Sequence, residues 1–117
     1  MSRILITILL SIFVQAAGAG SLKGKVTDIT ITGNDRLGGC MVKLDTTAPA
    51  CSSQWFSFNC SGVAIRGVTT TPQAQAFRLM DAGQLAYEIG APVKIFYDGT
   101  KINGHCLSDR IAVRPVN

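Results

Sequence analysis

A single amphipathic helix set among strand-forming segments is the feature that most constrains the fold of this 117-residue chain. The stretch Thr71–Pro92 predicts it, because Thr71 suits an N-cap and Pro72 suits the first helical position, where no amide donor is needed. Gly90 suits a left-handed C-terminal cap, and Pro92 prevents the helix from continuing. Strand-like segments precede and follow the helix, which gives it a defined place in the element order.

The predicted helix has one face of small and apolar residues, so it can lie close to a sheet. At about 100° per residue, this face holds Ala76, Leu79, Gly83 and Ala86. Phe77 and Leu85 instead lie on the polar side. Apolar residues there indicate either a subunit contact or a surface covered by the loop Ser61–Thr70.

The first 19 residues have the pattern of a secretory signal peptide. Arg3 supplies a positive charge, Ile4–Val14 is an almost continuous apolar run, and Ala17-Gly18-Ala19 fits the small-x-small cleavage rule. The run is shorter than the ~20 apolar residues that a membrane anchor needs. We therefore expect a signal peptide over residues 1–19, one domain over residues 20–117, no membrane span, and a secreted or periplasmic protein.

The first predicted strand, Gly24–Thr32, is rich in β-branched residues. Its inward alternation breaks, because Val26 and Ile29 have opposite parity. A bulge near Thr27-Asp28 would restore the alternation and bend the strand. A bent first strand is what a small closed barrel requires.

The next two segments, Cys40–Thr46 and Gln54–Cys60, predict an antiparallel hairpin. One register places apolar residues and one cysteine pair on the same face, setting Leu44 opposite Phe56, Val42 opposite Phe58, and Cys40 opposite Cys60. Four cysteines in an exported chain predict two disulfides. This register therefore predicts a Cys40–Cys60 bridge and leaves Cys51 to pair with Cys106.

Two strands, Pro92–Asp98 and His105–Arg114, follow the helix. Turn signals occur at Asp98-Gly99 and Asn103-Gly104. In the last strand we expect the inward residues Leu107, Ile111 and Val113. Asp109 shares their parity, which indicates a second bulge beside it.

The element order is therefore three strands, one helix and two strands. This predicts a mainly β protein with one helix, folded as a five-stranded OB-fold-like barrel, a Greek-key barrel whose helix lies between the third and fourth strands. A mixed α+β sandwich is the alternative. The bent first strand favours the barrel.

Composition and charge disfavour several functions. The formal net charge is +4, and the basic residues are scattered without a run, so we expect no nucleic-acid partner. One histidine and no CxxC spacing predict no metal site, and no feature indicates a cofactor. His105 beside Cys106 suggests a nucleophile pair, but oxidation of Cys106 in an exported chain argues against it. We expect no enzymatic activity.

Candidate ligand-binding residues lie on the outer face of the predicted hairpin. Trp55 is the only tryptophan, and its ring can stack on a sugar or a base, as aromatics in OB-folds do. The alternative is a rim residue covered by the loop 47–53. Lys43 and Asn59 share the face of Trp55 and complete the predicted ligand-binding set.

The chain resembles the binding (B) subunits of bacterial AB toxins, of the subtilase-cytotoxin and typhoid-toxin type. The likeness lies in Gln84–Ile95, where a helix ends at a glycine before an alternating Val/Ile strand, in Trp55-Phe56-Ser57, and in the late Cys106. The resemblance implies binding of a glycan or another cell-surface ligand, and a homo-oligomer, a pentameric ring whose helices line the centre. The alternative is a secreted or periplasmic structural or interaction protein with an OB-like barrel and no glycan site.

Overall fold

The computed structural model describes residues 19–33, 37–62, 64 and 72–116. The predicted signal peptide up to residue 18 and the predicted cap at Thr71 lie outside these ranges. The described residues form five strands and one helix, in the order β1 (Ala19–Ile31), β2 (Cys40–Ala48), β3 (Ser53–Ser57), α1 (Gln73–Ile89), β4 (Pro92–Ile102) and β5 (His105–Val113).

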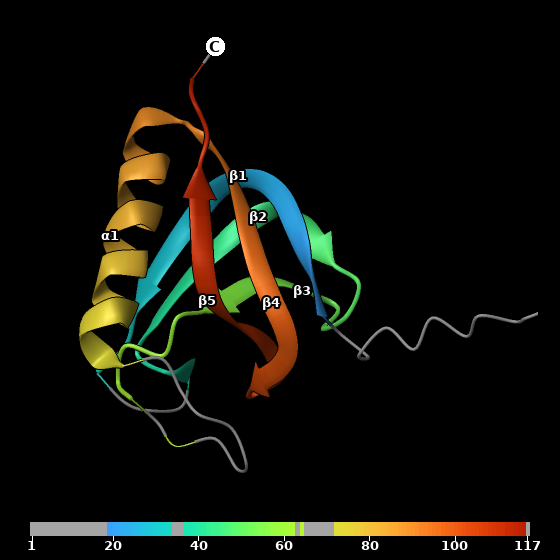
Figure 1. Cartoon of the computed structure of the whole chain (residues 1–117), viewed down its shortest axis with the longest axis vertical. Coiled ribbons are helices and arrows are strands. Elements are labelled where there is room, and N and C mark those ends of the chain that lie inside the picture. Colours follow the sequence, from blue (N-terminus) through green and yellow to red (C-terminus); the bar gives the residue numbers. More distant parts are fainter. Residues whose placement is uncertain (1–18, 34–36, 63, 65–71, 117) are drawn as a thin grey trace, which may run out of the picture.

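The five strands close into a barrel in the order β1-β2-β3-β5-β4, and α1 packs beside it (Figure 1). Neighbouring strands are antiparallel except β3 and β5, which are parallel. This confirms the OB-fold-like barrel with its helix between the third and fourth strands. No helix in the described ranges is long and apolar enough to cross a membrane.

A bulge in β1 lets this strand serve two neighbours. Its first half pairs with β4 and its second half with β2, and the register shifts between Val26 and Asp28. The bulge confirms the expected break in alternation: Val26 is buried in the core, and Ile29 packs against the core after the shift. β1 begins at Ala19, five residues before the predicted start at Gly24.

The predicted register of the β2–β3 hairpin was wrong by two residues. Val42 lies opposite Phe56, and Met41 opposite Ser57. A shift of two keeps every side chain on its expected face, because side chains alternate with period two. The apolar pattern therefore could not separate the two registers.

The Cys40–Cys60 disulfide is nevertheless confirmed, with Cα atoms 5.5 Å apart. Strand β3 ends at Ser57, and Asn59 adopts a left-handed conformation (φ 60°) that turns the chain. Phe58 donates its amide hydrogen to the carbonyl oxygen of Cys40 (3.3 Å), which brings the turn back to β2. Cys60 thus reaches Cys40 from a turn and not from the facing strand.

The second predicted bridge, Cys51–Cys106, is also confirmed, with a Cα–Cα distance of 5.8 Å. Cys51 follows β2, and Cys106 lies in β5 opposite Phe56 of β3. The bridge therefore links the β2–β3 connection to the only parallel pair of strands among the described residues.

Strand β4 is longer than expected. The predicted turn at Asp98-Gly99 is wrong: Gly99 lies within β4 with φ 94°, where the register is irregular. The hairpin turn is the one predicted at Asn103-Gly104, and both residues have positive φ, as the favoured hairpin turns require.

The second bulge, at Asp109, is confirmed. Tyr97 lies opposite Ser108 while Phe96 lies opposite Arg110, so Asp109 has no partner on β4. The prediction that Leu107 points into the core was wrong. Because the bulge reverses the alternation before it, Cys106 belongs to the core cluster, and Leu107 is buried outside that cluster. Ile111 and Val113 pack against the core as expected.

Helix α1 lies close to the barrel, because its inner face is small. Ala76, Met80, Gly83 and Ala86 are its buried residues, and Leu79 is half-buried. Gly90 is the left-handed C-cap (φ 68°), as predicted. Pro72 is the N-cap residue and not the first helical residue, so the helix begins one position later than expected.

We expect Gly83→Leu to destabilise the protein by about 2 kcal/mol, because overfilling a packed contact costs more than the gain in helix propensity. A Cβ atom at Gly83 would already lie 3.0 Å from Cγ1 of Val42. Urea unfolding with intact disulfides measures the change. Asp81→Leu, on the exposed face, is the matched control and should stay within about 0.5 kcal/mol of the parent. Equal stability of the two variants would contradict the close approach.

Candidate functional site

A shallow apolar hollow lies on the outside of the barrel, over β2 and β3. It has a volume of about 260 Å³ and is lined by Thr30, Leu37, Met41, Trp55 and His105. These residues come from the end of β1, the β1–β2 connection, β2, β3 and the start of β5. The β2–β3 face and the loops at its two ends are where OB-folds bind oligosaccharides and oligonucleotides.

Hydrogen bonds to Ser53 connect the His105 ring and the Trp55 backbone in this hollow. The hydroxyl of Ser53 lies 2.8 Å from Nδ1 of His105, and the same oxygen accepts the backbone N–H of Trp55 at 3.0 Å. Ser53 therefore links the start of β5 to β3, orienting the imidazole of His105 and fixing the backbone from which the Trp55 side chain projects. Both side chains are half-buried, so each keeps an accessible part.

Lys43 shares the face of Trp55, as the sequence predicts, although the predicted register sets Lys43 opposite Ser57 and not opposite Trp55. The two residues are directly opposed in the β2–β3 pair, and Lys43 forms an ion pair with Asp28 of β1 (3.8 Å). This pair is partly exposed, so the ammonium group is screened by solvent and remains accessible. Asp28, Lys43 and Trp55 thus form one row across three strands.

The structure does not bring Asn59 to this surface. Its side chain is fully buried (0% exposed), and its backbone N–H donates a hydrogen bond to the hydroxyl of Ser57 (3.1 Å). The residue lies beyond the end of β3, in the turn before Cys60. The expectation that Asn59 contacts a ligand depended on a straight strand, which ends two residues earlier.

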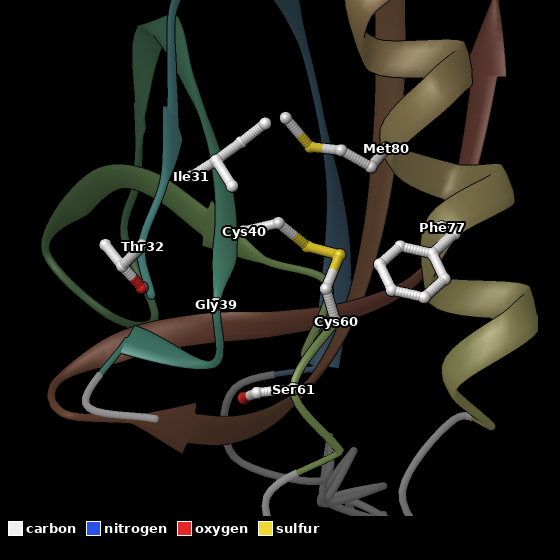
Figure 2. Close-up of a pocket in the computed structure, with 8 residues that line it drawn as sticks. All are labelled: Ile31, Thr32, Gly39, Cys40, Cys60, Ser61, Phe77 and Met80. Carbon is white, nitrogen blue, oxygen red and sulfur yellow. A yellow bond between two sulfur atoms is a disulfide. The ribbon is translucent and has the colours of Figure 1, made fainter. Parts of the chain in front are cut away.

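A second hollow, of about 220 Å³, lies between α1 and the end of the barrel. Figure 2 shows the Cys40–Cys60 disulfide in its wall, with Phe77 from the helix facing the sulfur atoms. Ser61 contributes a buried hydroxyl oxygen that has no hydrogen-bond partner among the described residues. The hollow is mainly apolar, which suits packing against another apolar surface.

The two helix residues predicted as subunit contacts are exposed. Phe77 is 52% and Leu85 51% exposed, and Ile89, one turn after Leu85, is 50% exposed. The alternative, that the loop 61–70 covers Phe77 and Leu85, concerns a segment that lies largely outside the described residues. The helix therefore presents apolar side chains to solvent.

The site offers little for metal binding or for nucleophilic catalysis. Within the described residues, no three His, Cys, Asp or Glu side chains come together as metal ligands. The sulfur of Cys106 is bonded to Cys51, so no free thiol lies beside His105. Ser53 does bond to His105, but in the described part of the chain no carboxylate orients the ring as a catalytic pair requires.

The sequence analysis names Trp55, which lines the hollow, and Lys43, which lies beside Trp55, as ligand-binding candidates, but none of the other lining residues. Thr30, Leu37 and Met41 are unremarkable in sequence and become a site only through strand pairing. His105 was considered only with its neighbour Cys106. A signal for its place in the hollow is present in the sequence, because OB-folds bind ligands with the connection between strands four and five, and His105 begins β5.

The chain matches no protein-family model and no curated protein. Its function must therefore be inferred from the geometry of its surfaces.

Replacing Ser53 by Ala should loosen the hollow, because the hydroxyl that holds His105 and the Trp55 amide is removed. We expect a loss of about 1 kcal/mol in stability and stronger acrylamide quenching of Trp55 fluorescence. Trp55 is the only tryptophan, so the signal reports on this site alone. Ser21→Ala, on the exposed outside of β1, is the control. Unchanged quenching in the Ser53 variant would show that the hydroxyl does not position the indole.

Proposed function

We propose that this protein is a secreted, non-catalytic binding module that recognises a glycan or a similar cell-surface ligand through the hollow around Trp55. The observation that carries this proposal is the place of the hollow, over β2 and β3 and between the β1–β2 and β4–β5 connections. OB-folds bind oligosaccharides at this position. The resemblance to toxin B subunits points to the same class of ligand.

The chemistry of the hollow suits a sugar. An indole offers an apolar face for the C–H side of a ring, and His105 offers a polar ring nitrogen beside it. Lys43 adds a charged donor at the rim. The volume lies below the ~300 Å³ at which pockets for drug-sized ligands begin, so one ring of a longer chain is the expected occupant.

Binding of oligosaccharides should change Trp55 fluorescence, and Trp55→Ala should weaken binding about five- to hundredfold, the range for loss of one stacking contact. A glycan array followed by fluorescence titration with the best ligands measures both effects. Trp55→Phe keeps an aromatic face and should retain most of the affinity. If no oligosaccharide on the array binds, the alternative of a structural or interaction protein without a glycan site replaces this proposal.

We further propose that the protein self-associates through α1, as a ring of five copies if it assembles as the toxin B subunits do. The exposed apolar side chains of Phe77, Leu85 and Ile89 support this, because they project from the same outward side of the helix and apolar surface left exposed marks protein contacts. They lie on a different element from the hollow around Trp55. A ring therefore leaves the ligand sites accessible.

Native mass spectrometry should therefore detect an oligomer, and Phe77→Ser/Leu85→Ser should shift it to the monomer, because the apolar contact is removed. Lys23→Ser/Lys101→Ser, on exposed positions of strands β1 and β4, should leave the oligomer intact. A monomer in the parent protein at the highest concentrations measured would contradict the ring. Glycan binding by that monomer would leave the ligand proposal standing.

A further inference from the structure

Away from the hollow, the outer surface of β1, β4 and β5 carries a concentrated positive charge. The first half of β1 lies beside β4, and β4 lies beside β5 (Figure 1). Residues 22, 93, 95, 111 and 113 pack into the core, so their neighbours in these strands point outward. Three rows of outward residues result: Ser21, Phe96 and Arg110; Lys23, Lys94 and Ala112; Lys25, Pro92 and Arg114. We call these nine positions the basic face.

The basic face holds five of the chain's eleven lysines and arginines and no acidic residue. Neighbours across the strands are about 5 Å apart, and neighbours along a strand about 7 Å apart. In the described part of the chain, none of these five cations forms an ion pair. The sequence analysis found the basic residues scattered, and strand pairing brings nearly half of them together.

Among the described residues, three carboxylates lie at the borders of the basic face. Asp45 accepts the backbone N–H of Lys25 at one end, and Asp98, one row beyond Phe96, accepts the backbone N–H of Thr100. Asp109 occupies the β5 bulge. The five cations of the basic face outnumber these three border carboxylates, so the face keeps a net positive charge.

Phe96 organises two of the cations. The Nζ atom of Lys94 lies 5.1 Å and the Cζ atom of Arg110 4.3 Å from the centroid of its ring. Cation–π contacts of this kind hold long side chains in place. Because two cations already lie against this ring, it serves as a support for them and not as a stacking platform.

We propose that the basic face binds an anionic polysaccharide, a chain carrying repeated sulfate, phosphate or carboxylate groups. Uncompensated cations in a regular array complement a polyanion, and the two disulfides indicate an oxidising compartment, where such polysaccharides occur. Nucleic acid fits less well, because single strands bind through free aromatic faces as well as charge, and the ring of this surface is occupied. The surface is separate from the hollow around Trp55, so the proposal does not rest on glycan binding there.

The test compares two charge-matched variants of the protein with both disulfides intact. Lys23→Gln/Arg110→Gln removes two charges from the basic face, and Lys101→Gln/Arg78→Gln removes one lysine and one arginine from exposed positions elsewhere. Binding to heparin, with neutral dextran as the control polymer, is measured by calorimetry from about 50 to about 500 mM salt. We expect the parent protein to bind heparin with an affinity that falls as salt rises. The first variant should lose affinity about five- to thirtyfold, and the affinity of the second should change little.

Other outcomes would overturn the proposal. Equal losses in the two variants would mean attraction by net charge without a defined surface. Tighter binding to single-stranded DNA than to heparin, or binding to phosphatidylserine vesicles without binding to heparin, would assign the face to a nucleic acid or to a membrane. Trp55→Ala should leave heparin affinity unchanged, and a loss in that variant would mean that the two surfaces are one site.

Discussion

A β-bulge in β1 and another in β5 let this barrel close, because five strands can close on each other only if some of them bend. Each bulge inserts one extra residue into its strand. In β1 the extra residue lies between Val26 and Asp28, and in β5 it is Asp109. Each bulge also exchanges the inner and outer sides of the strand beyond it. Without the second bulge, Arg110 would share the inward side of Cys106, and its guanidinium would have to be buried in an apolar core.

The same two bulges divide the outer surface into regions with different chemistry. Before its bulge, β1 turns Lys23 and Lys25 outward on the basic face; after it, Asp28 and Thr30 point outward beside Lys43 and the hollow. Because the strand bends at this point, the two regions face different directions. One small barrel thus presents two surfaces of different chemistry, an aromatic hollow and a charged plane, for which we propose different ligands.

The element order, both bulges and both disulfides could be predicted, because each follows from parity, propensity or cysteine spacing. The hairpin register could not, because registers that differ by two residues bury the same faces. The prediction of a turn at Asp98-Gly99 was wrong because a glycine with positive φ fits an irregular strand as well as a turn. The composition of the outer surfaces could not be predicted from the sequence. His105 lies near Trp55, and Lys23 lies beside Lys94, only because strands distant in the sequence pair.

The parallel contact between β3 and β5 is short, extending through Phe56 opposite Cys106 and Ser57 opposite Leu107. Because it has the fewest paired residues of the five strand contacts, it is where we expect the barrel to open first. The Cys51–Cys106 disulfide lies across this contact. That bond keeps β5 covalently attached to the β2–β3 connection even when the strand contact opens. The oxidised chain can loosen locally, but it cannot flatten into an open sheet whose two free edges would recruit further chains. Oxidation of this one pair therefore protects the protein from edge-to-edge aggregation as well as from unfolding.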